Sequence, residues 1–448
     1  MEALKGINIK VEPPGPIAKK IIEMDEKYLA RSTKSLPIVA KRGYNSYIED
    51  VDGNVFLDFT TGISTTNIGY MNKNVLDAVE EQLHQLWHFA GTDFYYEAQV
   101  NAAKALGEVA PGNFNKKVFF ANSGAESNEA SLKVAKNYTK KRQFIGFIGA
   151  FHGRTMGALA FTASKPVQHS MYFPEMPGVV HVPYPNPYRN PFNIDGYENP
   201  DELVNRTIDF IEKYTLETYL PADDVAAIMV EPIQGEGGYI VPPENFHREL
   251  IKLAHENNIL LIMDEVQTGF GRTGYFFASE YFKVEPDIIS VAKSIASGIP
   301  MGASIFNEKF DFDKEGLHSN TFGGNLLASV ACTATINEIK EKKMLENSRK
   351  MGKYLNKRLN ELKDKYEEIG DVRGLGLMQA IDFVNDRSRR DFNVGLRDRV
   401  IERSFKNGLL LLGAGESAIR LIPPLIITEE EIDNAIEIID ESINRELK

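Results

Sequence analysis

Two apolar stretches decide the fold: Ile259-Leu-Leu-Ile-Met263-Asp264 and Asp287-Ile-Ile-Ser-Val291-Ala-Lys293. Each is short, almost continuously aliphatic and followed by a charged side chain, which is typical of a strand buried on both faces of a parallel sheet. Asp264 and Lys293 then project from the carboxyl ends of buried strands, where open α/β sheets bind their ligands. The two stretches therefore predict a parallel sheet that presents a carboxylate and an amine at its ligand-binding edge.

Other apolar runs alternate with amphipathic patterns through the middle of the chain. The runs lie at 117–121, 144–148 and 225–230. Between two of the runs, Phe246, Leu250, Leu253 and Ala254 recur at the spacing of one helical face. Alternating strands and helices predict an α/β fold with a mostly parallel sheet covered on both faces.

The pattern divides the chain into three regions. Residues 1–73 carry Asp52-Gly53-Asn54 between two alternating apolar runs, which predicts a β-hairpin. We expect residues 74–325 to form a large domain. Residues 326–448 open with a long charged helical stretch, followed by a strand-like run at 375–383. This last region predicts a smaller α/β domain, to which the N-terminal β element contributes.

The overall composition argues against several classes of protein. The chain has 448 residues and a formal net charge of −12, without blocks of Lys and Arg, so we expect no nucleic-acid partner. No segment approaches the ~18 consecutive apolar residues of a membrane-spanning helix, so we expect no membrane partner.

Cysteine and histidine are both scarce in the chain. Cys332 is the single cysteine, which excludes an intrachain disulfide and favours a reducing compartment. The eight histidines form no H-E-x-x-H motif, and the single H-x-x-x-H pair, His84 and His88, has no glutamate after its first histidine, so we expect no metal. Taken with the absence of an apolar leader, these features predict a cytoplasmic protein.

An amine and a carboxylate at one sheet edge suit pyridoxal phosphate chemistry. A lysine forms a Schiff base with the aldehyde of that cofactor, and an aspartate keeps its ring nitrogen protonated. There are simpler interpretations, because an aspartate at a strand end often caps the next helix and a lysine often extends into solvent. A buried Lys293 would instead have a lowered pKa and serve as nucleophile and proton carrier.

A third polar motif follows the run at 117–121. Asn122-Ser-Gly-Ala-Glu-Ser127 precedes a helical pattern, and backbone amides at a helix start, with a hydroxyl beside a glycine, can cradle a phosphate. The alternative is an ordinary helix cap, because Ser and Asn are common in that position.

The chain resembles the class III (subgroup II) aminotransferases, a pyridoxal phosphate family with the aspartate-aminotransferase fold, known as fold type I. Six motifs carry the resemblance in order and in register: Asn122–Glu126, Phe151-His-Gly-Arg-Thr155, Glu231-Pro-Ile-Gln-Gly-Glu-Gly-Gly238, Asp264–Gly269, Ala292-Lys-Ser294 and Thr321-Phe-Gly-Gly-Asn325. The motifs lie between residues 122 and 325, and the resemblance continues from the N-terminal β element to Arg420, which makes the signal far more specific than any single motif.

The resemblance implies cofactor-binding roles for two early motifs. Ser123, Gly124 and Ala125 are expected to hold the phosphate of pyridoxal 5′-phosphate. Phe151 is expected to stack on its pyridine ring, with His152 beside it.

The resemblance also implies roles for the later motifs. Asp264 is expected to face the ring nitrogen, Gln267 to bond the ring hydroxyl, and Val266 to pack on the other face of the ring. Lys293 is expected to form the internal aldimine. Thr321 is expected to reach the phosphate of the other subunit, which makes a homodimer with a shared active site part of the expectation.

Two arginines and two glutamates are the candidates for substrate binding. A guanidinium offers a carboxylate a planar, bidentate partner, so Arg154 and Arg420 suit the two ends of an ω-amino acid or dicarboxylate. Arg420 could alternatively form a surface ion pair, but its flanking apolar residues favour a buried site. Glu236 can neutralise Arg420 when no second carboxylate is bound, and Glu231 is expected to position polar groups near Arg154. Ile63 is expected at the pocket mouth.

By resemblance, this set is similar to that of the 4-aminobutyrate aminotransferases. Arg154 would bind the distant carboxylate of an ω-amino donor, and Arg420 the α-carboxylate of a 2-oxo acid acceptor such as 2-oxoglutarate. Lys293 would act as both nucleophile and general base. Where many family members carry Gly-His-x-His-Pro, however, this chain has Gly69-Tyr-Met-Asn-Lys-Asn74.

Other activities stay open. The Val182–Tyr188 loop and Pro423-Pro424 also resemble family members that racemise or epimerise amino acids, and an ornithine aminotransferase is a further alternative. A third class is a regulatory protein that kept the fold, but the complete catalytic set argues against it.

Overall fold

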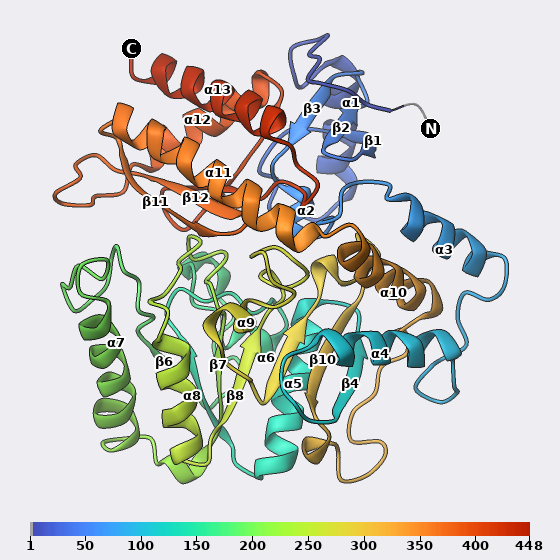
Figure 1. Cartoon of the computed structure of the whole chain (residues 1–448), viewed down its shortest axis with the longest axis vertical. Helices are drawn as coiled ribbons and strands as arrows, with labels where there is room; N and C mark the ends of the chain where they lie inside the picture. The colour runs from blue at the N-terminus through green and yellow to red at the C-terminus, as the bar shows by residue number, and fades with distance from the viewer. Residues whose placement is uncertain (1–2) are drawn as a thin grey trace.

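The computed structural model describes residues 3–448 and contains, within them, three β-sheets. The largest has seven strands in the order β4-β10-β9-β8-β7-β5-β6 and forms the lower half of the molecule in Figure 1. Its strands are β4 (Lys116–Ala121), β5 (Gln143–Phe147), β6 (Val179–Val182), β7 (Val225–Val230), β8 (Leu260–Asp264), β9 (Ile288–Val291) and β10 (Gly302–Asn307).

The large sheet is parallel apart from one strand. β10 pairs antiparallel with both β4 and β9, whereas β6, β5, β7, β8 and β9 pair parallel. The prediction of a mostly parallel α/β sheet is therefore confirmed. β8 and β9 are direct neighbours, with Asp264 opposite Ser290, so the strands that lead to Asp264 and Lys293 end side by side.

Helices cover both faces of the large sheet. Helix α8 (Phe246–Glu256) buries Phe246 and Leu250 against the face that presents Ile228 of β7. Helix α5 (Gly124–Thr139) buries Leu132 against the opposite face, which presents Ala227. Successive residues of β7 thus point to opposite helical layers, which explains why the strand is apolar at every position.

The two smaller sheets combine segments from both ends of the chain. One contains β1 (Ala40–Tyr44), β2 (Tyr47–Asp50), β3 (Val55–Asp58) and β13 (Leu409–Leu410), and the other β11 (Ile369–Leu375), β12 (Met378–Phe383), β14 (Leu412–Ala414) and β15 (Ala418–Leu421). β2 and β3 form the antiparallel hairpin expected around Gly53. β13 pairs parallel with β3, so the N-terminal β element and the C-terminal region share one sheet.

One strand prediction was wrong in its extent. The strand-like run at 375–383 is not continuous, because the chain reverses between β11 and β12, which pair antiparallel with Leu375 opposite Met378. Gly376 sits in this turn with a φ of 56°, in the left-handed region that glycine adopts without strain. A short tight turn inside an apolar run gave no break in the hydrophobic pattern.

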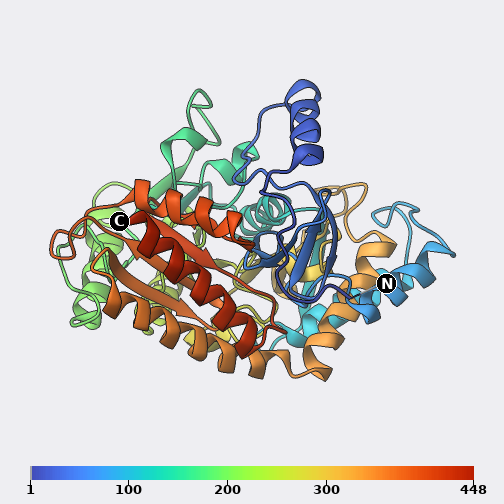
Figure 2. The same ribbon diagram turned by 90° about the horizontal axis from the view of Figure 1, so that it is seen from above.

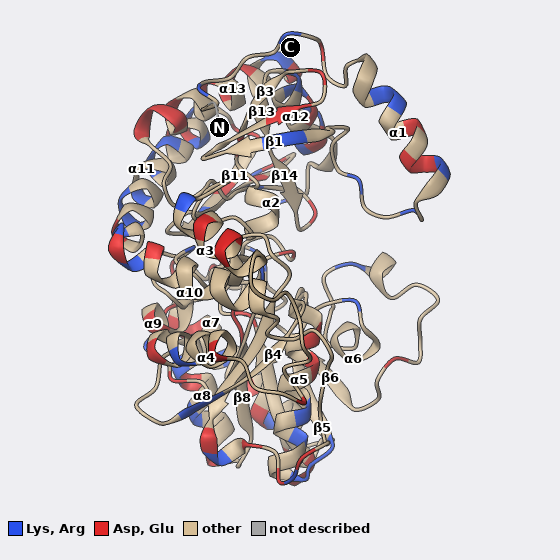
Figure 3. Cartoon of the chain, turned by 90° about the vertical axis from the view of Figure 1, so that its right-hand side faces the viewer, with Lys and Arg blue, Asp and Glu red and all other residues tan. Residues whose placement is uncertain are grey.

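Three long helices cover the C-terminal sheet: α11 (Met344–Lys365), α12 (Val394–Lys406) and α13 (Glu429–Glu446). Figure 2 shows α13 lying between α12 and α11. Figure 3 marks the Lys and Arg positions along α11 in blue on the ribbon, and three of these residues pair with acidic residues of α13. These pairs are Lys350–Glu429, Arg358–Asp433 and Lys365–Asp440.

The remaining helices connect the sheets. They are α1 (Pro16–Tyr28), α2 (Thr61–Ser64), α3 (Lys73–Leu83), α4 (Glu97–Val109), α6 (Met156–Leu159), α7 (Pro200–Asp209), α9 (Ala278–Phe282) and α10 (Leu326–Glu341). Single turns of 3-10 helix cover Pro166–Gln168, Ala222–Asp224, Lys293–Ala296 and Glu308–Phe310, and a π-helical turn covers Phe210–Leu216. Within residues 3–448, no helix has both the length and the apolar character to cross a bilayer.

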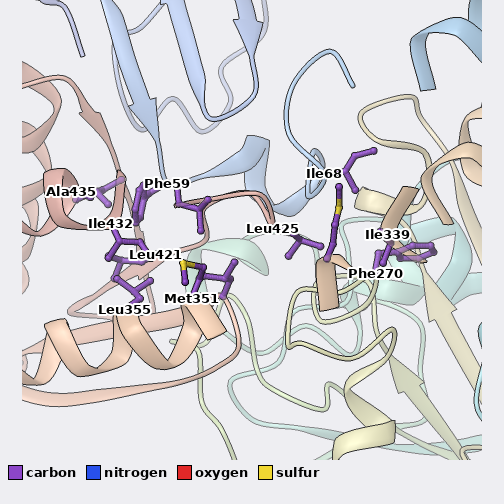
Figure 4. Close-up of a cluster of buried hydrophobic side chains, with 14 of the residues drawn as sticks. Phe59, Ile68, Phe270, Ile339, Met351, Leu355, Leu421, Leu425, Ile432 and Ala435 are labelled. Carbon is purple, nitrogen blue, oxygen red and sulfur yellow. The ribbon is translucent and has the colours of Figure 1, made fainter. Parts of the chain in front are cut away.

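A continuous hydrophobic core joins the large sheet to the two smaller ones. Figure 4 shows Phe59 of the N-terminal region, Phe270 of the large sheet region and Leu355 of α11 among the members of this cluster. Helix α10 packs against α3 and α4. We propose that the large domain spans residues 74–325 and that residues 326–448 form the smaller domain with the β element of residues 1–73.

Candidate functional site

A pocket of about 1340 Å³ opens at the carboxyl ends of β8 and β9, between the large sheet and the smaller ones. Its lining includes nearly all of the residues that the sequence singles out: Ile63, Ser123, Gly124, Ala125, Phe151, His152, Arg154, Glu231, Glu236, Asp264, Val266, Gln267, Lys293 and Arg420. Thr321 is the exception, because it is exposed and does not line the pocket.

Asp264 is held rigidly at the pocket floor. Its Oδ2 lies 2.7 Å from His152 Nδ1 and accepts a hydrogen bond of 2.8 Å from Asn128 Nδ2. Its Oδ1 accepts a bond of 3.0 Å from the backbone N–H of Val266. Because Asp264 is only 4% exposed, these donors compensate its carboxylate for lost water. The alternative role as a helix cap does not apply, because the next helix of the described chain, α9, begins only at Ala278.

Asn128 is a site residue that no sequence motif predicted. It lies fully buried in α5, and its Nδ2 also donates a hydrogen bond of 2.7 Å to the carbonyl oxygen of His152. Since Gly124 and Asn128 are four residues apart, they share a helix face. That spacing within the Asn122–Ser127 motif region was the available signal.

Lys293 follows β9 in a left-handed conformation, with a φ of 50°. Its side chain is half-buried, and desolvation lowers the pKa of its amine, although Asp264 and Glu231 act in the opposite direction. Within the described chain its Nζ makes no hydrogen bond or ion pair. A lysine in this setting is closer to a free nucleophile than a lysine in solvent.

The start of α5 faces the pocket. Ser123 is its N-cap, and the hydroxyl accepts a bond of 3.2 Å from the N–H of Glu126, so the ordinary capping role is present. The N–H groups of Gly124 and Ala125 in the first turn have no helical acceptor and remain for a ligand. A Cβ at Gly124 would lie 2.9 Å from Val266, so the close approach here requires glycine.

Unpartnered polar atoms test whether the pocket fits pyridoxal phosphate. Gln267 Oε1, His152 Nε2 and Asn128 Oδ1 are buried without a hydrogen-bond partner in the described chain. Buried polar atoms normally have partners, so a bound polar molecule is expected here. Together with a fixed carboxylate, an amine of lowered pKa and a free helix start, these atoms fit that cofactor.

Glu231 accepts hydrogen bonds from two backbone N–H groups, one of them three residues before Arg154. Its two carboxylate oxygens accept bonds of 2.8 Å each, from the N–H of Phe151 and from that of Gly235. Burial raises the pKa of Glu231 to about 7. Arg154 is exposed instead, with its guanidinium carbon 5.4 Å from the ring centroid of Phe151.

Arg420 and Glu236 form the expected ion pair inside the pocket. Arg420 Nη1 donates to Glu236 Oε2 at 3.3 Å, and the arginine side chain is 8% exposed, so it is not a surface pair. Lys165, which no sequence motif predicted, donates a hydrogen bond of 2.9 Å to Glu236 Oε1. One carboxylate therefore faces two cations.

The pocket mouth contains an unusual backbone segment. Ile63 is 42% exposed and has a φ of 63°, and its neighbours in Thr61–Ser64 also have positive φ values. A β-branched residue in this region is a conformational outlier. The segment includes Gly62 and Ile63 among the residues that line the pocket.

Comparison with known proteins agrees with this geometry. The class-III aminotransferase family model matches residues 28–443. The chain is 42% identical to an alanine/serine racemase of Pyrococcus horikoshii, over 97% of this chain and 92% of that protein. It is 36% identical to a 4-aminobutyrate aminotransferase of Mycobacterium leprae, over 96% of each.

A solved structure extends the similarity to the cofactor. An amine transaminase from an uncultivated Pseudomonas species, in a PLP-bound form, superposes with a TM-score of 0.86 and 29% identity, covering 93% of this chain and 98% of that chain. The architecture of fold type I is therefore shared throughout. The chain belongs to the class III aminotransferase family, and it is a pyridoxal 5′-phosphate-dependent enzyme.

Proposed function

We propose that this protein transfers the amino group of an ω-amino acid, such as 4-aminobutyrate, to 2-oxoglutarate or a similar 2-oxo acid. The observation that carries the proposal is the pair of arginines in the Lys293 pocket, of which Arg420 already holds a carboxylate of the protein. A pocket with two guanidinium groups suits an acceptor with a carboxylate at each end, such as 2-oxoglutarate, and it suits an ω-amino donor with one carboxylate while Glu236 neutralises Arg420.

The proposal assigns the cofactor to the polar groups around the pocket floor. Ser123, Gly124 and Ala125 would hold its phosphate at the start of α5, and Asp264 would face its ring nitrogen. Phe151 and Val266 would enclose its ring. When bound, pyridoxal phosphate supplies an aldehyde that captures amines and a ring that withdraws electrons from the substrate carbon.

Three other residues complete the cofactor contacts in this proposal. Gln267 would donate to the ring hydroxyl, and Lys293 would attach to the aldehyde carbon. His152 would act through Asp264, because its Nδ1 lies 2.7 Å from that carboxylate and keeps it oriented.

Lys293 has two tasks in the proposed reaction. Its amine is the nucleophile that the substrate amine displaces, and once displaced it moves a proton between two carbons as general base and acid. The lowered pKa leaves more of this amine unprotonated near neutral pH. Asp264 would stabilise positive charge at the ring nitrogen.

The substrate would be oriented by the two arginines. Arg154 would bind the distant carboxylate of the ω-amino donor, while Glu236 neutralises Arg420. When the 2-oxo acid enters, its α-carboxylate would replace Glu236 at Arg420. Ile63, at the mouth, would pack against the substrate chain, and Glu231 would keep the backbone of Phe151 in place.

A homodimer is part of the proposal. Thr321 would contact the cofactor phosphate of the other subunit, and exposed aromatic residues lie beside it. His88 and Phe322 are in contact with ring centroids 4.8 Å apart, and Phe322 is 59% exposed. Trp87 is 63% exposed as well. Exposed aromatics that cluster in this way are typical of a protein interface, so a second copy is the expected cover.

A second candidate function is amino-acid racemisation. Identity of 42% to an alanine/serine racemase favours it. A racemase would use the same Lys293 and Asp264, with an additional group to reprotonate the opposite face of the substrate carbon. In that case a single α-carboxylate would bind Arg420, and Arg154 would have no partner on the substrate.

One experiment tests the proposal and separates the two candidates. The holoenzyme is incubated with single L-amino acids without a keto acid, and in parallel with 4-aminobutyrate and 2-oxoglutarate. Formation of glutamate only when both substrates are present supports transamination. A D-amino acid formed without any net amine transfer supports racemisation. If neither glutamate nor a D-amino acid forms, both candidates are refuted.

The cellular setting is a further part of the proposal. Cys332 is buried and free in the described chain. A single shielded thiol without a disulfide suits a reducing compartment, so we propose a cytoplasmic location.

A further inference from the structure

Glu236 is shared between two cations that come from different parts of the molecule. Lys165 reaches it from the segment after α6, and Arg420 reaches it from β15. The carboxylate uses one oxygen for each cation, Oε1 for Lys165 and Oε2 for Arg420. The lysine side chain is 32% exposed, that of Glu236 23%, and all three line the same pocket.

The two contacts differ in quality. The Lys165 contact of 2.9 Å is an ordinary charge-assisted hydrogen bond, whereas the Arg420 contact is a single bond of 3.3 Å. The buried Nε of Arg420 has no partner in the described chain. Arg420 therefore keeps unused capacity for a planar, bidentate carboxylate, and Glu236 is held mainly by Lys165.

The backbone around Glu236 is fixed, so only its side chain can respond to a substrate. The carbonyl of Glu236 accepts 2.7 Å from the N–H of Gly415. The carbonyl of Gly238 accepts from Arg373, through Nε at 2.9 Å and Nη2 at 2.6 Å. The Cα of Glu236 therefore stays beside the pocket when a ligand carboxylate replaces the Glu236 carboxylate at Arg420.

We propose that Lys165 is a positioning residue that retains Glu236 when the α-carboxylate of a substrate binds Arg420. This inference rests on the proposed function, in which such a carboxylate enters the pocket. Without Lys165, the displaced Glu236 would be an uncompensated negative charge beside an incoming carboxylate. With Lys165, Glu236 keeps a cation, and Arg420 is released at lower free-energy cost.

The inference separates substrates by class. A ligand with an α-carboxylate needs Arg420 and therefore depends on Lys165. A ligand such as 4-aminobutyrate, whose carboxylate would bind Arg154, leaves Glu236 on Arg420 and depends on Lys165 much less. Lys165 thus sets the preference between α-carboxylate and ω-amino substrates.

The test compares Lys165→Met with wild-type holoenzyme by calorimetric titration of glutarate, which has two carboxylates and no reactive amine. We expect Lys165→Met to weaken glutarate binding by about fivefold to tenfold. Lys165→Arg, which keeps the charge, should restore affinity to within about twofold. The apparent dissociation constant of 4-aminobutyrate, read from the absorbance of the bound cofactor, should change less than that of glutarate.

A double-mutant cycle excludes a merely structural role. In the Glu236→Gln background there is no carboxylate for Lys165 to retain, so Lys165→Met should no longer affect glutarate affinity. Equal weakening of both ligands, or the same loss with and without Glu236, would overturn the inference. If Lys165→Met does not fold, Lys165→Gln takes its place in the same cycle.

Failure of the proposed function gives a different result. In that event the wild-type holoenzyme binds neither glutarate nor 4-aminobutyrate, and the comparison is repeated with L-alanine and ethylamine. L-alanine also carries an α-carboxylate for Arg420, so the same Lys165 dependence is expected if racemisation is the activity. If Lys165→Met changes the affinity for no ligand of either pair although the wild-type enzyme binds them, the inference about Lys165 is refuted and the proposed function is not.

Discussion

The hydroxyl of Ser294 donates a hydrogen bond of 2.5 Å to the carbonyl of Ser64, which links the turn after Lys293 to the pocket mouth. Ser64 ends the Thr61–Ser64 segment, whose positive φ values include Ile63. Non-glycine residues in this conformation cost about 1–3 kcal/mol each and persist only where neighbours hold them. The neighbours here include Ile422, whose carbonyl accepts 3.0 Å from the hydroxyl of Thr61.

Replacing Ser294 with Ala should loosen this segment. The buried carbonyl of Ser64 would lose its donor, which we expect to destabilise the fold by about 1–3 kcal/mol. Because Ile63 would no longer be held, KM should rise more than kcat falls. The measurements are thermal unfolding of the holoenzyme and steady-state kinetics. Ser294→Thr keeps the hydroxyl and is the control. An unchanged KM in Ser294→Ala would show that Ile63 does not contact the substrate.

Replacing Lys293 with Ala should abolish turnover. The nucleophile and proton carrier would both be lost, and sodium borohydride should no longer attach the cofactor covalently to the protein. Mass spectrometry of the reduced protein measures this directly. Lys252→Ala, on the exposed surface of α8, is the matched control and should be labelled like wild type. Covalent labelling of the Lys293→Ala variant would contradict the assignment.

Replacing Asp264 with Asn should leave the pocket shape intact and remove the negative charge. We expect kcat to fall by at least about 100-fold, because a fixed charge in a site shielded from water contributes strongly to transition-state stability. Asn128→Ala should have a smaller effect, since His152 still holds the carboxylate. Single-turnover absorbance changes provide the measurement. A larger loss in Asn128→Ala than in Asp264→Asn would contradict the proposed role.

Replacing Arg154 with Gln should affect one class of donor. The exposed guanidinium lies over Phe151 and is proposed to bind the distant carboxylate of the donor. KM for 4-aminobutyrate should rise about tenfold or more, because a charge-assisted pair is lost. A simple primary amine of the same length serves as the comparison substrate and should be affected far less. Equal effects on both would remove Arg154 from substrate recognition.

The sequence predicted the fold class and most of the pocket because the relevant signals are local. Buried strands are apolar at every position, and the polar residues that follow β8 and β9 converge by topology alone. Even so, β6 and β10 were not singled out, and the β11–β12 turn was hidden inside one apolar run.

The contacts that orient the site were not predictable in this way. Lys165 and Ser294 act through partners that are distant in sequence, namely Glu236 and Ser64. Neither spacing nor periodicity records such pairs, because they depend on how loops and sheets pack in three dimensions. The contacts of Glu231 with the backbone N–H groups of Phe151 and Gly235 depend on the same three-dimensional packing.

His247 should make the protein sensitive to acid. Its ring is fully buried, Nε2 lies 2.9 Å from the carbonyl of Pro232, and desolvation lowers its pKa from 6.5 to about 4. The unfolded state therefore binds the proton at higher pH than the folded state, so stability from this group is complete above pH 6.5 and is lost as pH falls toward 4. At about pH 5 the loss in the free energy of unfolding is about 2 kcal/mol.

His247→Gln has no titrating ring, and Tyr184 still donates a hydrogen bond of 3.0 Å to the Pro232 carbonyl. The free energy of unfolding of wild type minus that of His247→Gln should thus decrease from about pH 7 to about pH 5, and a difference independent of pH would contradict a neutral buried imidazole.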